Sequence, residues 1–183
     1  PLAVQASTTY TITQTNFSGT ASGTYALAVV KKDLTVQADS KSKIYGSADP
    51  SLTATSNGLV LGDTLTGSLT RTEGENVGTY PIGQGTLAIA DEKAGNYNFF
   101  FTESTFTIDA KAIEVTASNA SKTYGDSDPS SFAYITDGLV GLDKLEGSLA
   151  RKSGEDVGDY TITGTLTNSN YAVTLIDGTF TIK

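Results

Sequence analysis

The sequence predicts an all-β protein in which two small modules of the same kind follow one another in an elongated arrangement. The first observation is a repeat: residues 43–51 return as residues 122–130, 79 positions later, and each copy opens the same series of landmarks. A repeat of fixed period sets the architecture before any single motif is considered. The second observation is a succession of short runs rich in Thr, Val, Ile, Tyr and Phe, bounded by Gly, Asn and Ser. We therefore expect sandwich-like or β-grasp-like modules, each with at most a turn or two of helix.

Composition excludes several classes of function. With 38% hydrophobic and 17% charged residues, the chain has the composition of a folded protein. A net charge of −8 without a Lys/Arg cluster argues against nucleic acid. No apolar run is long enough for membrane insertion. Because the chain has no Cys and no His, disulfides, thiolate zinc sites, imidazole metal sites and histidine-based triads are ruled out.

Residues 1–32 read as leader strands. Residues 8–14 and 24–30 are β-rich, and the segment between them carries turn residues. Residues 10–13 match residues 160–163, so the leader is interpreted as the tail of a preceding repeat that packs on the first module. The chain begins at Pro1 and has no Met, which we take to indicate a piece of a longer polypeptide.

The first module is expected at residues 33–109. An Asp49-Pro50 pair follows its tyrosine turn and predicts a turn or a single turn of helix, because Asp caps free N–H groups and Pro suits a first helical position. The predicted strands occupy residues 34–38, 43–45, 79–82, 86–89, 97–101 and 105–108.

The second module is expected at residues 110–183 and repeats these landmarks in order. It is shorter mainly at residues 91–95 of the first module, which are therefore predicted to form an exposed loop. Only residues 109–111 join the modules, so we expect a semi-rigid, end-to-end pair.

The landmarks resemble the MBG repeats (mostly-β, glycine-containing; YGX type). The shared motifs are Tyr-Gly-x-x-Asp-Pro, Gly-Leu-Val, Gly-Glu-x-Val-Gly-x-Tyr, Asn-Tyr and Thr-Phe-Thr-Ile, and the second copy departs at Leu142, where the first has Gly62. The landmark residues are Tyr45, Gly46, Asp49, Pro50 and Tyr80 in the first copy, and Tyr124, Gly125, Asp128, Pro129 and Tyr160 in the second. Such repeats occur in tandem in large bacterial surface proteins and adhesins, so the resemblance implies an extracellular stalk without catalytic residues.

Carboxylates offer two candidate chemistries. Asp126 and Asp128, with Asp143 or Glu155, could supply oxygens for calcium. Since Ser47 replaces Asp126 in the first copy, turn capping by the two aspartates of the Asp-Pro pairs is favoured, and we expect no metal and no cofactor. Paired carboxylates of the kind found in glycosidases also occur, but in Gly-flanked turns that suit a solvated loop. These pairs are Glu73 with Glu75 and Glu155 with Asp156. We therefore expect no enzyme.

Aromatic residues are the remaining candidates. Tyrosines at equivalent places in both modules are expected in the core or at a corner with a hydrogen-bonded hydroxyl, with stacking on a partner as the alternative. They are Tyr45, Tyr80 and Tyr97, with counterparts Tyr124, Tyr160 and Tyr171. Phe99, Phe100 and Phe101 have no aromatic counterpart and form a candidate contact patch, for an inter-module contact rather than a ligand. A lysine–Asn/Asp isopeptide crosslink is not indicated.

The sequence thus predicts a stalk or spacer repeat of a bacterial cell-surface adhesin that projects a distal binding region. Its expected partners are neighbouring repeats of the same polypeptide. The alternative is an adhesion module that binds a host or surface glycan or protein.

Overall fold

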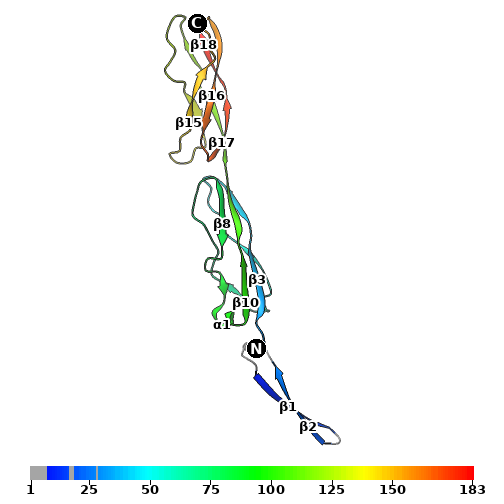
Figure 1. Cartoon of the computed structure of the whole chain (residues 1–183). Coiled ribbons are helices and arrows are strands. Elements are labelled where there is room, and N and C mark those ends of the chain that lie inside the picture. Colours follow the sequence, from blue (N-terminus) through cyan, green and yellow to red (C-terminus); the bar gives the residue numbers. More distant parts are fainter. Residues whose placement is uncertain (1–7, 17–18, 28) are drawn as a thin grey trace. The chain divides into compact units, whose positions relative to one another are not determined.

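The computed structural model describes residues 8–16, 19–27 and 29–183, with side chains from residue 29 onward (Figure 1). The predicted all-β fold is confirmed: the described residues form short strands and one four-residue helix, α1 (Asp91–Ala94). Within the described part of the chain, no helix has the length and apolar character needed to cross a membrane.

The chain divides into two compact units that are interleaved in sequence. Unit 1 contains residues 1–41, 51–72 and 80–106, and unit 2 contains residues 42–50, 73–79 and 107–183. Two segments of the first repeat, 42–50 and 73–79, therefore belong to the same compact unit as the whole second repeat. The tyrosine turn at Tyr45-Gly46 is in the first of these segments.

The leader forms a two-stranded antiparallel sheet. Strand β1 (Thr8–Asn16) pairs with β2 (Gly19–Leu27), from Thr8 opposite Leu27 to Asn16 opposite Gly19. The predicted packing of leader side chains on the first module lies outside the described residues.

In unit 1, a three-stranded sheet has the order β10-β3-β5. Its strands are β3 (Lys32–Ala38), β5 (Ala54–Asn57) and β10 (Tyr97–Thr102). Strand β3 runs parallel to β10 and antiparallel to β5. Alternate residues of β3 are buried, as the two-residue period of a strand requires. Leu34 and Val36 of β3 share a buried cluster with Ile89 and Tyr97.

The other strands of the first repeat have two to six residues. Strands β6 (Leu65–Thr66) and β9 (Ala88–Ile89) form an antiparallel pair. A further sheet has the order β4-β11-β8-β7. Its strands are β4 (Lys41–Ile44), β7 (Thr70–Arg71), β8 (Gly78–Gly83) and β11 (Ser104–Asp109).

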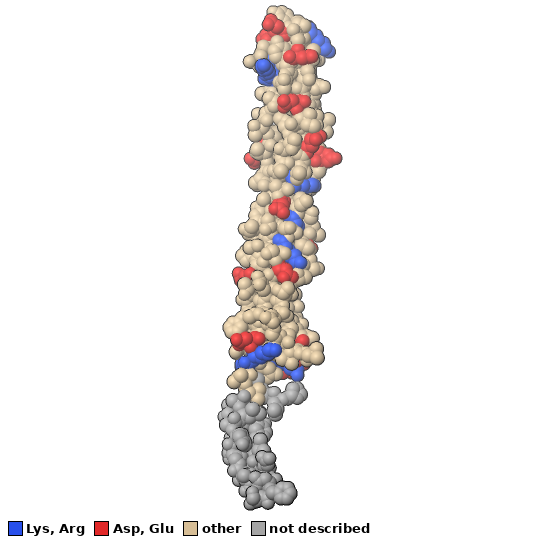
Figure 2. Space-filling model, turned by 90° about the vertical axis from the view of Figure 1, so that its right-hand side faces the viewer, with Lys and Arg blue, Asp and Glu red and all other residues tan. Residues whose placement is uncertain are grey.

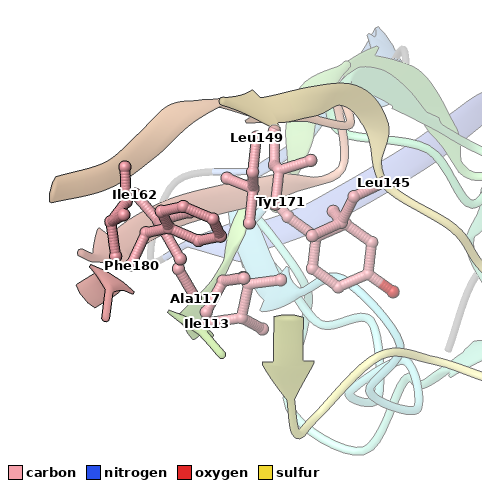
Figure 3. Close-up of a cluster of buried hydrophobic side chains, with 10 residues drawn as sticks. Ile113, Ala117, Leu145, Leu149, Ile162, Tyr171 and Phe180 are labelled. Carbon is pink, nitrogen blue, oxygen red and sulfur yellow. The ribbon is translucent and has the colours of Figure 1, made fainter. Parts of the chain in front are cut away.

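In unit 2, the second repeat is a sandwich of two sheets. One sheet has the order β14-β12-β17, with β12 (Lys111–Ala117), β14 (Tyr134–Thr136) and β17 (Tyr171–Ile176). The other has the order β13-β18-β16-β15, with β13 (Ala120–Lys122), β15 (Glu146–Arg151), β16 (Gly158–Thr167) and β18 (Gly178–Ile182). Buried side chains of both sheets form one cluster, in which Ile113 of β12 lies with Ile162 of β16 and Phe180 of β18 (Figure 3).

The predicted turn or single turn of helix at Asp49-Pro50 is wrong. Residues 48–53 have no regular secondary structure and lead into β5. The Asp49 carboxylate binds the Lys43 ammonium group at 2.7 Å, and the chain that follows is rich in Thr, which favours a strand over a helix. The helix α1 instead lies in the loop at residues 91–95, which the second repeat shortens.

Candidate functional site

Within unit 2, two tyrosines converge on one carboxylate. The Tyr45 hydroxyl donates a hydrogen bond to Oδ2 of Asp143 at 2.9 Å, and the Tyr171 hydroxyl donates to the same oxygen at 2.5 Å. The two rings meet edge to face, with centroids 5.4 Å apart and planes at 77°, a geometry that aromatic pairs prefer. Tyr45 comes from the first repeat and the other two residues from the second. We call the group Tyr45, Gly46, Asp143, Asn170 and Tyr171 the tyrosine joint.

Gly46 allows the tyrosine loop to approach the second repeat closely. Its φ of +80° is in the left-handed region, and a Cβ at this position would lie 2.5 Å from Cγ2 of Val140. A side chain would therefore cost both backbone strain and a steric clash. The glycine of the Tyr-Gly motif is needed at this joint for two independent reasons.

Asn170 holds the second segment of the first repeat. Its Oδ1 accepts a hydrogen bond from the Val77 N–H at 2.9 Å, and its Nδ2 donates to Oδ1 of Asn76 at 3.0 Å. The side chain is buried, so these bonds satisfy groups that would be costly to leave unpaired. The turn at residues 73–79 is thereby fixed beside the tyrosine loop, within unit 2.

Tyr171 is the anchor of the joint. It begins β17, is 7% exposed, and accepts a hydrogen bond from the Val140 N–H at 2.8 Å. In Figure 3 its ring lies at the edge of the buried cluster and its hydroxyl points away from it. Burial and the hydrogen bond to Asp143 raise the pKa of Tyr171, and the hydrogen bond to Asp143 is the main cause of the raised pKa of Tyr45. Both phenols therefore stay neutral and donate to the carboxylate.

Unit 1 contains the same aspartate–tyrosine pair. The Tyr97 hydroxyl donates to Oδ2 of Asp63 at 2.5 Å and accepts from the Val60 N–H at 2.9 Å. Burial, then the bond to Asp63, raises the pKa of Tyr97. The pair lines a cavity of about 490 Å³ together with Val30 and Leu61. Each repeat thus carries an aspartate–tyrosine pair of the kind that binds Tyr45 in the tyrosine joint.

A second cluster in unit 2 joins two cations to two carboxylates. The Arg151 guanidinium binds Asp128 through Nε at 2.7 Å and Nη2 at 3.1 Å, and Lys122 binds the same carboxylate at 2.7 Å. Glu155 contacts both cations. Arg151, then Lys122, lowers the pKa of Asp128 to about 2. The guanidinium carbon also lies 5.1 Å from the ring centroid of Phe180, so the cluster is linked to the core.

The first repeat has the corresponding lysine cluster. Lys43 is only 8% exposed and binds Asp49 at 2.7 Å, with Glu75 as its other carboxylate partner. Burial opposes the charged form, but the hydrogen bonds with Asp49 and Glu75 raise the pKa of Lys43. Sequence reasoning assigned the aspartates to turn capping and missed these ion pairs. The signal was present, because Lys43 recurs as Lys122 at the same spacing as the tyrosine motif.

The Lys122–Asp128 ion pair of unit 2 has the wrong protonation for an isopeptide bond. Amide formation requires a neutral amine that attacks a protonated carboxyl group. In unit 2 the pKa of Lys122 is raised by Asp128 and Glu155, and the pKa of Asp128 is lowered. The groups are therefore held as ions.

Three of the four carboxylates considered for calcium, all but Asp126, are engaged by different partners. Asp128 and Glu155 bind Lys122 and Arg151, whereas Asp143 binds two tyrosine hydroxyls. In the part of the chain that the structure describes, no three His, Cys, Asp or Glu residues are grouped to hold a metal ion. Figure 2 shows acidic and basic side chains interspersed over the face in view.

The other predicted aromatic residues occupy varied positions. The Tyr160 hydroxyl donates to the Asp156 carbonyl at 2.8 Å, as expected for a corner tyrosine, and Tyr80 is half-buried beside Arg71. Tyr124 is 64% exposed. Of the phenylalanine triplet on β10, Phe99 and Phe101 pack against the unit 1 cluster, and Phe100 is 52% exposed.

Comparison with known protein families identifies the family to which the chain belongs. The family model of the MBG domain (YGX type) matches it twice, at residues 34–107 and 113–181, which together make up more than half of the chain. No curated protein matches the sequence. The chain therefore belongs to the YGX-type MBG domain family, of which it carries two tandem copies.

Proposed function

We propose that the chain is a structural stalk or spacer segment of a large bacterial cell-surface adhesin, in which it projects a distal binding region away from the cell. Repeats of this family are typical of surface proteins, which supports an extracellular, cell-surface location. The proposal assigns no catalytic residue to the chain. In this proposal the chain serves to hold one folded repeat in a fixed position after another.

The observation that carries the proposal is the tyrosine joint. A spacer must resist bending at the point where one repeat ends and the next begins. Here a loop of the first repeat shares a hydrogen-bonded carboxylate and an aromatic contact with the second, within one compact unit. The Asn170 side chain adds two further hydrogen bonds from the same repeat boundary. A flexible linker would need none of these contacts.

Small-angle scattering tests the proposal directly. A compact globule of this length has a radius of gyration of about 16 Å. A spacer requires a clearly larger value and a rod-like cross-section profile. A radius near that of the globule would refute the stalk function.

One observation favours the alternative of an adhesion module. Phe100 is half-exposed on β10, between two residues that pack inward. A glycan array or a protein pull-down with the parent chain and a Phe100→Ala variant separates the two functions. Binding that disappears with Phe100→Ala supports the adhesion module, and its absence leaves the spacer as the function of this segment.

A further inference from the structure

The second repeat carries a tyrosine loop of its own. The Tyr124 N–H donates to the Lys183 carbonyl at 2.8 Å, as the Tyr45 N–H donates to the Asp109 carbonyl at 2.9 Å. Gly125 has a φ of +87°, close to the +80° of Gly46. The two loops are thus held by the same backbone hydrogen bond and have the same glycine conformation.

The supporting lysine cluster is also the same in both loops. Lys122 binds Asp128 and Glu155, as Lys43 binds Asp49 and Glu75, and each Lys–Asp distance is 2.7 Å. These ion pairs connect the Tyr-Gly-x-x-Asp-Pro loop to the Gly-Glu turn. The side of the first repeat that enters the joint is therefore reproduced on the second.

The two loops differ in what covers them. A Cβ on Gly46 would clash with Val140, but a Cβ on Gly125 would meet no described atom within 4 Å. Tyr124 is 64% exposed, whereas Tyr45 is half-buried against Tyr171. Tyrosine is among the residue types that dominate the energetics of protein interfaces, and this one is exposed on a loop of fixed conformation.

We propose that the Tyr124 loop docks on a further YGX-type repeat, through an aspartate–tyrosine pair of the kind that receives Tyr45. Such a pair is present in both repeats of this chain, as Asp63 with Tyr97 and Asp143 with Tyr171. This inference rests on the proposed function, in which repeats follow one another. It adds the chemistry of the contact: a phenol on a shared carboxylate, with a glycine beside it.

The turn that accompanies the loop is compatible with this occupant. In the first repeat, Asn76 accepts a hydrogen bond from the Asn170 amide, and Asp156 occupies the equivalent place in the second. A carboxylate accepts from an amide N–H at least as well as an amide oxygen does. Val157, the counterpart of Val77, offers its N–H for the other bond and is 67% exposed. Both hydrogen bonds of the Asn170 side chain can therefore form between the second repeat and a further repeat.

The test uses the full chain and an extended chain, in which residues 110–183 are appended after Lys183. This extension keeps the joint at its natural length and presents Asp143 and Tyr171 of the appended copy to Tyr124. Hydroxyl-radical labelling with mass spectrometry then compares Tyr124 in the two chains, with Tyr45 as an internal reference. The appended copy carries Tyr124→Phe, so that Tyr124 of the original second repeat is read alone. We expect its labelling to fall several-fold, to the level of Tyr45, in the extended chain only.

Introduced cysteines give an independent readout on a chain that has none of its own. The ideal Cβ of Gly46 lies 3.6 Å from the Cβ of Val140, within the range of disulfides. The pair Gly46→Cys with Val140→Cys is the positive control in the parent chain. The test pair in the extended chain is Gly125→Cys with Val140→Cys of the appended copy, which carries the same backbone strain. We expect both pairs to oxidise.

Gly125→Ala is the variant that should block docking. In the parent chain (the full chain of 183 residues) the added methyl group meets no described atom, so the effect of the substitution on folding is measured there. In the extended chain the methyl group would clash with Val140 of the appended copy. Restored labelling of Tyr124 supports docking. If Tyr124 is labelled equally in the parent chain and in the extended chain while Tyr45 is protected, the loop is free for a partner of another kind and the inference is overturned. If Tyr124 is protected in the extended chain but the radius of gyration from small-angle scattering is that of a compact globule, only the spacer function is refuted.

Discussion

Replacing Tyr171 by Phe tests whether the tyrosine joint contributes to the stability of unit 2. The variant keeps the ring in the buried cluster and its edge-to-face contact with Tyr45. It removes the hydroxyl, which donates to Asp143 at 2.5 Å and accepts from the Val140 N–H at 2.8 Å. The change is therefore confined to two hydrogen bonds.

The expected cost follows from these two bonds. A hydrogen bond to a charged group contributes about 1.5–3 kcal/mol, and a buried donor left without a partner costs about 1–3 kcal/mol. Asp143 keeps the Tyr45 hydroxyl at 2.9 Å, and Val140 is only partly buried, so the lower part of these ranges applies. We expect the free energy of unfolding to fall by about 2 kcal/mol, which shifts a urea midpoint by about 1 M.

Urea unfolding followed by circular dichroism measures the change. Tyr134→Phe is the control, because the Tyr134 hydroxyl makes no hydrogen bond to any residue that the structure describes, and its removal should change stability by less than about 0.5 kcal/mol. A loss in Tyr171→Phe no larger than in the control would refute the assignment of the joint as a stabilising contact.

Three further predictions concern protons and covalent bonds. The folded-state pKa of Asp128, about 2, is below its usual 3.8, so the stabilising contribution of this carboxylate is complete above about pH 4 and is lost as the pH falls toward 2. Asp128→Asn should remove this part of the acid dependence of stability in urea titrations, and an unchanged acid dependence would contradict the prediction. Asp143→Asn should lower the pKa of Tyr45 toward its usual value, seen as earlier phenolate absorbance in an alkaline titration; identical curves for parent and variant would count against the shared carboxylate. Intact mass should equal the mass of the sequence, whereas a deficit of one water or ammonia would demonstrate an isopeptide bond.

Most of the fold could be predicted from the sequence, because the repeat and the two-residue period are local patterns. Residues 34–38 and 105–108 were expected as strands and lie in β3 and β11. The helical start expected at Asp49-Pro50 failed because local capping chemistry competes with tertiary ion pairs. The Asp49 carboxylate pairs instead with the ammonium group of Lys43, whose side chain is buried, and capping preferences alone do not reveal this partner.

The joint could be predicted only in part. The tyrosines were found because they recur, but recurrence in both copies was read as packing within each module. The partner of Tyr45 is Asp143, 98 residues away, and no spacing rule links them. A usable signal did exist: Asp63 and Asp143 occupy equivalent places although the glycine before the first is replaced by Leu142 in the second. An aspartate retained where its neighbour changed pointed to a role for the carboxylate.

The direction of the strands at the two ends of the second repeat determines how that repeat bears tension. Strand β13, which follows β12 in the chain, runs parallel to the final strand β18, with Ala120 opposite Phe180 and Lys122 opposite Ile182. Pulling on the two chain ends drags these neighbours past each other in shear, so their hydrogen bonds carry the load together and must rupture together. An antiparallel hairpin such as β1–β2, pulled at its open end, unzips one bond at a time. Single-molecule pulling should therefore open the second repeat in one high-force event, at a rate set by its unfolding barrier, and a gradual low-force extension would show that the parallel pair bears no load.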